Sequence, residues 1–297
     1  MPRLLSASVL AAAVVCSQAC DFNIDHQAYI ERDEKRFAAD KSIELHLYTF
    51  DGPIEIRSWD RPEAVIEIEK RGQNKEAVSK IQIIAEQSGN RIQIEARHPG
   101  GGSFVGIGRF TSPSAKFIAN VPRKINVVVR SGDGSIVAER LDGRIELRTN
   151  DGTIRAVETS GQLLAETGDG SIQLEEVSGR VECRTRDGSL RITGTPSVLR
   201  ARSGDGQVVV RVRNGAVMAE DWMVATDDGS ISVELPDGFN ASVEADPGSD
   251  GRARSELTLA DTTGGTRSDR VLRGRLGQGG KKLILRTGDG TIRITNY

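Results

Sequence analysis

This sequence has few aromatic residues and no large excess of positive or negative charge. Phe, Trp and Tyr make up 4% of the 297 residues, so few large rings are present to fill a thick core. The 40 Lys and Arg against 42 Asp and Glu leave a formal charge of -2, too weak a field to gather nucleic acid. We therefore expect no nucleic-acid partner, and the 37% apolar content predicts a folded protein.

Long hydrophobic runs are absent except near the N-terminus. Arg3 is followed by twelve mostly apolar residues and then by Ser17-Gln18-Ala19, which is the pattern of a secretory signal and too short for a membrane span. We predict that residues 1–19 are a signal peptide, so that cleavage leaves Cys20 first. A small residue followed by Cys resembles the bacterial lipobox, in which that Cys is lipidated. Ser17 stands where the lipobox usually has Leu, so cleavage without lipidation is the alternative.

Cysteine is also scarce. Of the three cysteines, Cys16 lies in the predicted signal and Cys20 at the cleavage point, which leaves Cys183 alone inside the fold. No disulfide within the folded domain is therefore possible, although an exported compartment would permit one. We expect an exported protein, periplasmic or at the cell surface, anchored to a membrane as a lipoprotein through Cys20.

The N-terminal part of the mature chain has no clear repeat. Residues 20–40 are polar and charged, which predicts a tether, and residues 41–122 alternate apolar and polar side chains in short runs, which predicts a β-rich region. Residues 74–80 suit one helical turn. The Gly-rich residues 100–109 resemble a phosphate loop superficially, but no strand, loop and helix unit surrounds them. We predict a loop there in which Phe104 touches a partner.

Nine-residue blocks then follow one another without a gap from Asp133 to Trp222. The fourth residue of each block is aliphatic, from Ile136 in the first to Val217 in the tenth, and the sixth residue is apolar in all ten. Two inward positions separated by one outward position predict a strand with one buried face. The blocks open with Asp-Gly, Ser-Gly, Asn-Gly or Pro-Ser, which suit a sharp corner.

Every second block opens with Asp-Gly, so the true repeat is eighteen residues, or two strands per turn. These five corners are at Asp133, Asp151, Asp169, Asp187 and Asp205. Stacked turns of this kind rise by about 4.8 Å and enclose a thin aliphatic core. We therefore predict an all-β protein, a β-solenoid with two strands and 18 residues per turn over residues 123–235, into which the N-terminal β-rich region continues.

The repeat breaks after the tenth block. Five extra residues, Met223 to Asp227, precede the next corner at Asp228. Residues 236–280 are rich in Gly, Asp, Ser and Arg and predict an irregular excursion with short strands, notably 256–260. Residues 281–297 repeat the motif, and we predict that they form the capping turn of the solenoid, covering an edge that would otherwise promote aggregation.

These features resemble a family of bacterial exported proteins, the "putative adhesin" domain-of-unknown-function family with a β-solenoid fold. The resemblance covers about residues 41–297. It rests on the repeated Thr/Ser-x-Asp-Gly-Ser/Thr-Ile signature, on Val121-Pro122 before the repeats, and on the closing motif at 286–294. It implies an adhesin-like protein and suggests no catalytic residues or cofactor.

An eighteen-residue turn aligns two kinds of polar side chain into columns. The corner Asp residues would lie about 5 Å apart and could attract divalent cations. Calcium-loaded rolls have a different nine-residue repeat, G-G-x-G-x-D-x-U-x, so we expect each Asp to accept a local backbone N–H and expect no metal site. The second column shares the parity of the inward positions and predicts a hydroxyl ladder in the core, formed by Thr149, Thr167, Thr185 and Ser203.

Groups that carry chemistry are few. His26, His46 and His98 have neither metal-ligand spacing nor a nucleophile motif nearby. The outward face of the even-numbered blocks mixes charges without an aromatic platform, and we take Arg184 and Arg202 as candidate surface contacts beside Phe104.

Two functions follow as hypotheses. The first is a non-enzymatic, exported cell-envelope scaffold or adhesin-like binding protein, whose partner is an envelope or surface component, either protein or polysaccharide. The alternative is a polysaccharide-processing β-helix enzyme, a lyase or hydrolase, because such enzymes also work with carboxylates.

Overall fold

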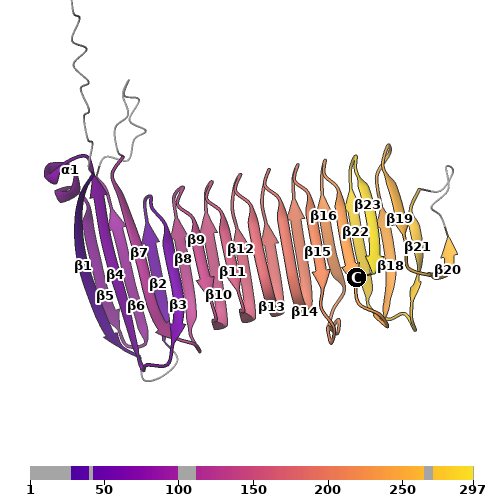
Figure 1. Cartoon of the computed structure of the whole chain (residues 1–297), viewed down its shortest axis with the longest axis horizontal. Coiled ribbons are helices and arrows are strands. Elements are labelled where there is room, and N and C mark those ends of the chain that lie inside the picture. Colours follow the sequence, from indigo (N-terminus) through magenta and orange to yellow (C-terminus); the bar gives the residue numbers. More distant parts are fainter. Residues whose placement is uncertain (1–27, 40–42, 100–111, 264–269, 297) are drawn as a thin grey trace, which may run out of the picture.

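A computed structural model describes residues 28–39, 43–99, 112–263 and 270–296 (Figure 1). These residues form 23 strands and one short helix, α1 (Lys75–Ser79), so the all-β prediction is confirmed. The helix lies where one helical turn was predicted. The side chain of its N-cap, Asn74, accepts a hydrogen bond of 2.9 Å from the backbone N–H of Ala77.

The strands form two facing layers, which we call the β2 face and the β3 face. Two long strands, β13 (Ile172–Arg184) and β14 (Leu190–Ser203), turn the corner and contribute to both. In spatial order the other strands of the β2 face are β5 (Gln82–Ser88), β6 (Arg91–Arg97), β2 (Glu44–Thr49), β8 (Asn126–Ser131), β10 (Asp142–Thr149), β12 (Ser160–Glu166), β16 (Trp222–Thr226), β22 (Lys282–Thr287), β18 (Ala241–Asp246), β21 (Leu272–Leu276) and β20 (Ala260–Thr263). Those of the β3 face are β1 (Tyr29–Ala38), β4 (Glu63–Gly72), β7 (Ser114–Pro122), β3 (Ile54–Trp59), β9 (Ile136–Glu139), β11 (Ile154–Val157), β15 (Val208–Val212), β17 (Ile231–Leu235), β23 (Thr291–Asn296) and β19 (Arg252–Ser255).

The register of the middle strands follows from the alternating pattern. Ile145 on β10 pairs in parallel with Val127 on β8 and with Leu163 on β12, each eighteen positions away. All three side chains are buried between the layers, whereas the next residue on β10, Glu146, points outward. A one-residue slip would place the charged set in the core, so burial fixes this register.

One long edge of the stack is made by the corners that join the β2 face to the β3 face. The Gly of each corner packs directly on the Gly of the preceding corner. A Cβ built on Gly188 would lie 1.9 Å from the carbonyl oxygen of Gly170, and one on Gly170 would lie 2.0 Å from that of Gly152. Only glycine permits this approach, which explains why Asp-Gly recurs once per turn.

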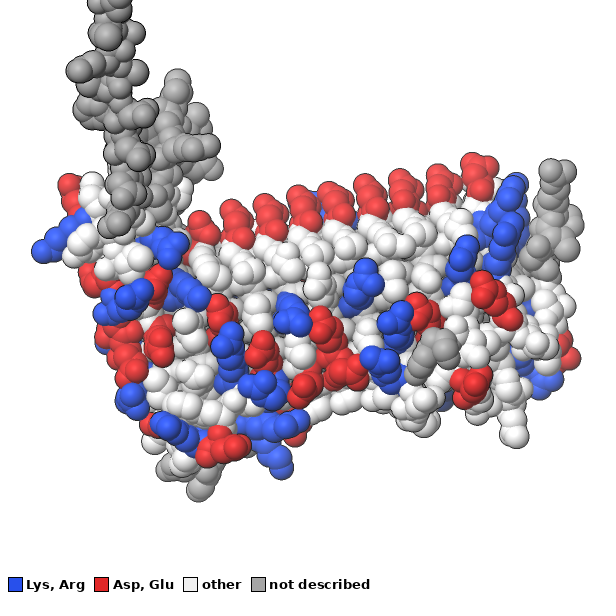
Figure 2. All heavy atoms as spheres, viewed as in Figure 1, with Lys and Arg blue, Asp and Glu red and all other residues white. Residues whose placement is uncertain are grey.

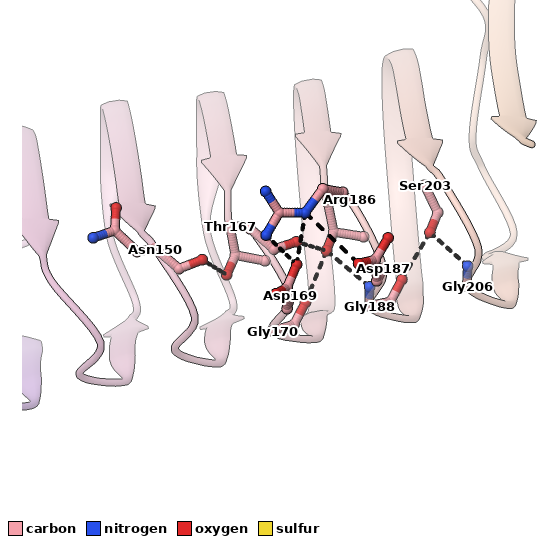
Figure 3. Close-up of polar contacts among 11 residues, drawn as sticks. Asn150, Thr167, Asp169, Gly170, Arg186, Asp187, Gly188, Ser203 and Gly206 are labelled. Atoms are coloured by element: carbon pink, nitrogen blue, oxygen red, sulfur yellow. Dashed lines mark hydrogen bonds and ion pairs between the residues drawn. The ribbon is translucent and has the colours of Figure 1, made fainter.

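The predicted hydroxyl ladder lies beside these corners and faces the core (Figure 3). Each hydroxyl bonds the backbone of its neighbours: Thr185 Oγ1 donates to the carbonyl oxygens of Gly168 and Gly170, both at 2.9 Å, and accepts from the N–H of Gly188 at 3.1 Å. The register extends the column beyond the four predicted members, and all eight are buried: Thr49, Ser131, Thr149, Thr167, Thr185, Ser203, Thr226 and Thr287.

Residues 29–38 correct the predicted tether at 20–40. They form β1, which pairs antiparallel with β4 along ten residues and ends the stack on the β3 face. Its outward positions are charged, which hid the strand in the sequence. The same charges suit an edge strand, because a charged edge discourages pairing with other chains.

The tenth block is also corrected. Val217 was expected in the core but its side chain is 74% exposed, whereas Met218, expected outside, is buried. Residues 213–221 form a loop, and the inserted residues lie there, before β16, and not at Met223 to Asp227. The alternation of buried and outward residues begins again at Trp222. Its side chain is fully buried, with its ring 5.7 Å from that of Phe239, and its indole N–H donates to the carbonyl of Ser197 at 3.2 Å.

The C-terminal segment is not the end of the stack. β22 lies between β16 and β18, and β23 lies between β17 and β19, so the predicted capping turn at 281–297 is an interior turn. The predicted excursion at 236–280 supplies the true end, with β18, β19, β20 and β21. The strand expected at 256–260 is absent, since β19 ends at Ser255 and β20 begins at Ala260.

The N-terminal end has the same arrangement. β2 and β3 form one turn that lies between β6 and β7 on one side and β8 and β9 on the other. The strands β4 to β7 that follow in sequence therefore close the far end of the stack, with antiparallel pairs β1–β4, β4–β7 and β5–β6.

Candidate functional site

The predicted contact residues on the repeats lie side by side. Arg184 on β13 pairs with Arg202 on β14, and both side chains are exposed on the β2 face. Arg202 Nη2 donates to both carboxylate oxygens of Asp227, at 3.0 and 3.2 Å. Two other predicted residues, Phe104 and the lipidation candidate Cys20, lie outside the described residues. The role of all four in binding stays a prediction.

An acidic ridge runs along the corner edge of the molecule, and Figure 2 shows it as a line of red side chains. It contains one Asp per turn: Asp51, Asp133, Asp151, Asp169, Asp187, Asp205, Asp228 and Asp289. All are exposed except the half-buried Asp51. Burial is the first cause that raises the pKa of Asp51, and the nearby carboxylate of Asp133 adds to it.

The ridge differs from the predicted turns in one respect. At four corners the N–H of the corner Gly is bound by the Ser or Thr hydroxyl of the buried column, as at Gly152 with Thr149 (3.3 Å). The carboxylate of Asp51 accepts a hydrogen bond from the backbone N–H of Gly52, as predicted, whereas the carboxylates of the other corners are exposed. Arg186 lies among them, with Nη2 2.6 Å from Asp169 Oδ1 and Nε 3.6 Å from Asp187 Oδ2 (Figure 3).

No metal site forms in the part of the chain that the structure describes: three or more His, Cys, Asp or Glu side chains nowhere come together in ligating geometry. Each turn brings one ridge carboxylate, about 4.8 Å from the next along the stack. A cation would therefore meet one ligand per turn, where calcium takes six to eight oxygen ligands.

A polar hollow of about 420 Å³ lies on the β2 face, where β6, β2, β8 and β10 run side by side. Outward residues of all four strands line it, and alternation places each of them: Glu44, His46, Tyr48, Arg91, Asn126, Val128, Arg130, Arg144 and Glu146. We call this set the β2-face hollow.

His46 is the centre of a hydrogen-bonded chain in the β2-face hollow. Its side chain is 7% exposed, with Nε2 2.7 Å from Glu44 Oε1 and Nδ1 2.6 Å from the hydroxyl of Tyr48. Arg91 Nη2 lies 3.2 Å from the same Nδ1. Because a guanidinium group can only donate, Nδ1 accepts and Nε2 carries the proton that is donated to Glu44. The imidazole therefore fixes the Tyr48 hydroxyl and the Glu44 carboxylate in place.

Glu146 forms the second cluster of the β2-face hollow. It points outward yet is 9% exposed, because three guanidinium groups surround its carboxylate. The contacts are loose: Arg148 Nε at 3.2 Å, Arg130 Nη2 at 3.5 Å and Arg144 Nη2 at 4.0 Å. Arg148 Nε also lies 3.1 Å from Glu166 but makes a well-directed hydrogen bond to neither carboxylate. One buried carboxylate thus lies among three guanidinium groups, one of which it shares with Glu166.

The hollow continues along the β2 face. A second hollow of about 250 Å³ shares Arg144 and Glu146 with the first and extends over β12 and β13 to Arg180 and Glu182. Arg180 Nη2 is 2.5 Å from Glu220 Oε1, which raises the pKa of Arg180 and keeps it charged. The two hollows together form a groove across the strands.

A separate hollow of about 720 Å³ lies at the edge opposite the acidic ridge. Three loops line it, at 213–221, 236–240 and 277–281, and Val217 is the exposed apolar residue at its border.

Sequence patterns did not predict the β2-face hollow. It showed that His46 and Tyr48 alternate with buried residues, but not which strand lies next to them. Leu45 pairs with Val127, eighty-two positions later, because β4 to β7 are inserted between them. The signal in the sequence was the concentration of Arg and Glu at outward positions of 91–97 and 142–148.

The comparisons place the chain in a family. Residues 42–295 match the family described as Toastrack DUF4097, and the chain belongs to it. The resemblance to a domain-of-unknown-function family is therefore confirmed. No curated protein matches the sequence, and among the described residues no helix is long and apolar enough to cross a membrane.

Three solved structures are among those that the chain is similar to. A putative adhesin from Parabacteroides distasonis has 10% identity and a TM-score of 0.42, covering 89% of this chain and 97% of its own. A putative lipid binding protein from the same species has 12% identity and a TM-score of 0.40, covering 89% and 96%. A putative cell adhesion protein from Clostridium sporogenes has 12% identity and a TM-score of 0.29, covering 90% and 100%. At such values these likenesses do not tell what this chain binds.

Proposed function

We propose that this chain is a non-enzymatic binding scaffold of the bacterial cell envelope, exported and held at a membrane by a lipid on Cys20. The observation that carries the proposal is the groove on the β2 face. It crosses six adjacent strands from Arg91 on β6 to Arg180 on β13, where outward charged and polar side chains line up in register. A surface of this shape suits an extended partner more than a small molecule.

The fold supports this role mechanically. Outward side chains on stacked strands are fixed relative to one another by the ladder of backbone hydrogen bonds, so a partner would meet a preformed surface. Binding would then spread over many weak contacts, and single substitutions would act in small steps. The polarity of the groove favours an envelope component with charged or hydroxyl groups, such as a polysaccharide or a polar protein surface.

A pull-down tests the binding role. The purified chain, immobilised and incubated with solubilised bacterial envelope, should retain envelope components that a blank resin does not. The double variant Arg184→Gln with Arg202→Gln should reduce this retention in part. The control, Arg155→Gln with Arg213→Gln, changes two half-buried arginines, one on the β3 face and one just beyond it. Retention no better than the blank would refute the proposal.

The anchor is tested separately. Mass spectrometry of the N-terminal peptide should show an acylated Cys20, and the wild-type chain should partition into detergent. A Cys20→Ser variant should stay in the aqueous phase. An unmodified Cys20, or a variant that remains equally membrane-bound, would remove the lipid anchor from the proposal.

A polysaccharide-processing enzyme is the second candidate, and one observation favours it. Glu44, His46 and Tyr48 form a chain of short hydrogen bonds beside Arg91, and a phenol held by an imidazole can exchange protons with a substrate. Purified protein mixed with envelope polysaccharides would then release reducing ends or unsaturated products. Product formation that Tyr48→Phe, Asp169→Asn or Asp187→Asn abolishes without unfolding would replace the scaffold by this candidate.

A further inference from the structure

The β2-face hollow carries arginine side chains that remain exposed. Arg130 and Arg144 are 54% and 70% exposed, and their contacts to Glu146, at 3.5 and 4.0 Å, are too long to occupy their N–H donors fully. Arg130 also lies over the ring of Tyr48, with its Cζ 5.6 Å from the ring centre. The carboxylate contacts both guanidinium groups and the ring lies beside one of them, so two partly exposed guanidinium groups line the hollow.

Guanidinium donors such as these favour a planar anion as their ligand. A guanidinium group presents two parallel N–H bonds to a carboxylate, and such bidentate pairs are stronger than neutral hydrogen bonds. Arg130 on β8 pairs with Arg148, and Arg144 on β10 lies level with Asn126, so the two arginines begin four positions apart on adjacent strands and reach Glu146 from opposite sides. Because Glu146 lies between them, a carboxylate of a ligand is best placed at Arg144, the more exposed of the two.

The acidic residues of the same groove argue against a densely charged ligand. Glu44 and Glu146 line the first hollow and Glu182 the second, among the arginines. A polyphosphate or nucleic acid would bring like charges against each of them, which costs binding energy. Carboxylates and the amides of Asn126 and Gln162 instead suit a ligand rich in hydroxyl groups, to which they bind as acceptors and donors.

The spacing of the cations sets the spacing of the ligand's charges. Arg144 on β10 pairs with Gln162 on β12, which in turn pairs with Arg180 on β13. Arg144 and Arg180 therefore lie two strands apart, or about 10 Å. An amide stands between them, which fits a chain in which charged and neutral units alternate.

We propose, on the basis of the binding role above, that this groove binds a carboxylated polysaccharide in which acidic and neutral sugars alternate. The chain crosses the strands along the row Arg144, Gln162 and Arg180, with one carboxylate at Arg144 and the next toward Arg180. His46 is a positioning residue, since it holds Tyr48 and through the ring of Tyr48 the guanidinium of Arg130. The chain bound in this way need not be cut.

Titration calorimetry with defined polymers tests the inference. Hyaluronan oligosaccharides, which alternate uronate and neutral sugar, should bind, whereas neutral dextran should not and polyphosphate should bind at least tenfold more weakly. Arg130→Gln with Arg144→Gln should weaken hyaluronan binding at least tenfold, and Arg144→Gln alone at least threefold. The control pair Arg155→Gln with Arg213→Gln should change it less than twofold.

The variants are informative because Arg144 is highly exposed and its loss should leave the fold intact by circular dichroism. Equal binding by the arginine variants, or tighter binding of polyphosphate than of hyaluronan, would overturn the inference. If the wild-type chain still retains envelope components in that case, the scaffold role stands and only its ligand class is wrong. If the chain binds neither hyaluronan nor any envelope component, both fail.

Discussion

The side-chain hydroxyl of Thr185 donates a hydrogen bond of 2.9 Å to the carbonyl oxygen of Gly170, in the preceding turn of the stack. The hydroxyl oxygen of Thr185 also accepts a hydrogen bond from the N–H of Gly188 in its own turn, at 3.1 Å. One buried hydroxyl thus ties two successive corners together where glycine leaves no side chain to pack. The relation repeats at Thr149 with Gly134 and at Ser203 with Gly188.

Thr185→Val should destabilise the fold by about 1–3 kcal/mol, because it keeps the shape and leaves the N–H of Gly188 and the carbonyl of Gly170 buried without this partner. Urea unfolding followed by circular dichroism measures the loss. Thr153→Val, at an exposed corner position, is the matched control and should change stability by less than about 0.5 kcal/mol. Equal midpoints for the two variants would show that the hydroxyl column contributes nothing.

Gly188→Ala should cost about 3 kcal/mol, since the added Cβ would lie 1.9 Å from the carbonyl oxygen of Gly170 and the turns would have to move apart. The neighbouring Ser189→Ala, at an exposed side chain, should be nearly neutral. Thermal unfolding of the two variants compares them directly. A melting temperature for Gly188→Ala within one degree of wild type would contradict the close stacking of the corners.

Val181→Asp should prevent folding, because its side chain is fully buried in a thin core that offers no partner for a charge. Glu182→Gln, one residue later and facing the groove, should fold normally. Circular dichroism and proteolysis of both variants give the answer. If both unfold or both remain folded, the assignment of inward and outward residues on β13 is wrong.

Cys183 should make stability depend on alkaline pH. Burial raises the pKa of its thiol to about 12 from an ordinary value of 9.0, so the folded state keeps the proton that the unfolded state releases. This contribution is complete below about pH 9 and is lost as the pH rises toward 12, at about 1.4 kcal/mol per pH unit.

The measurement for Cys183 is the free energy of unfolding at several pH values, compared with Cys183→Ala, which should lack the additional slope. The native thiol should also resist a maleimide reagent that modifies it rapidly in urea. Parallel slopes for wild type and Cys183→Ala, or fast labelling of the folded protein, would disprove the burial of this side chain.

Sequence patterns predicted the middle of the fold because its pairing partners recur at a constant distance. Ile154 lies between Ile136 and Ile172 in the structure, as the eighteen-residue period requires. The pattern failed at Val217 and Met218. Because these two apolar residues are adjacent, either register of the strand would bury one of them. In the structure residues 213–221 form a loop and the alternation begins again at Trp222, whose buried ring lies 5.7 Å from that of Phe239.

The candidate site was out of reach of the same reasoning. His46 becomes part of a site only because Arg91 and Arg130 lie near it. These two residues come from other strands, 45 and 84 positions later in the chain. Such pairings depend on how the inserted strands β4 to β7 fold back on the stack, which no local period encodes. For the same reason the position of β22 and β23 between earlier turns could not be foreseen from a motif that looks like one more repeat.

That interleaving changes how the protein can assemble. In an ordinary repeat array each turn docks on the turn before it in sequence, so folding can spread from any point and the ends can fray turn by turn. Here β18 and β19 can dock only after β22 and β23 have filled the layer beneath them, and β2 and β3 separate strands in the same way. Contacts of such sequence separation slow folding and bind distant segments into one cooperative unit. We therefore expect the chain to fold slowly and in one cooperative step. Neither end of the stack should unfold separately from the rest.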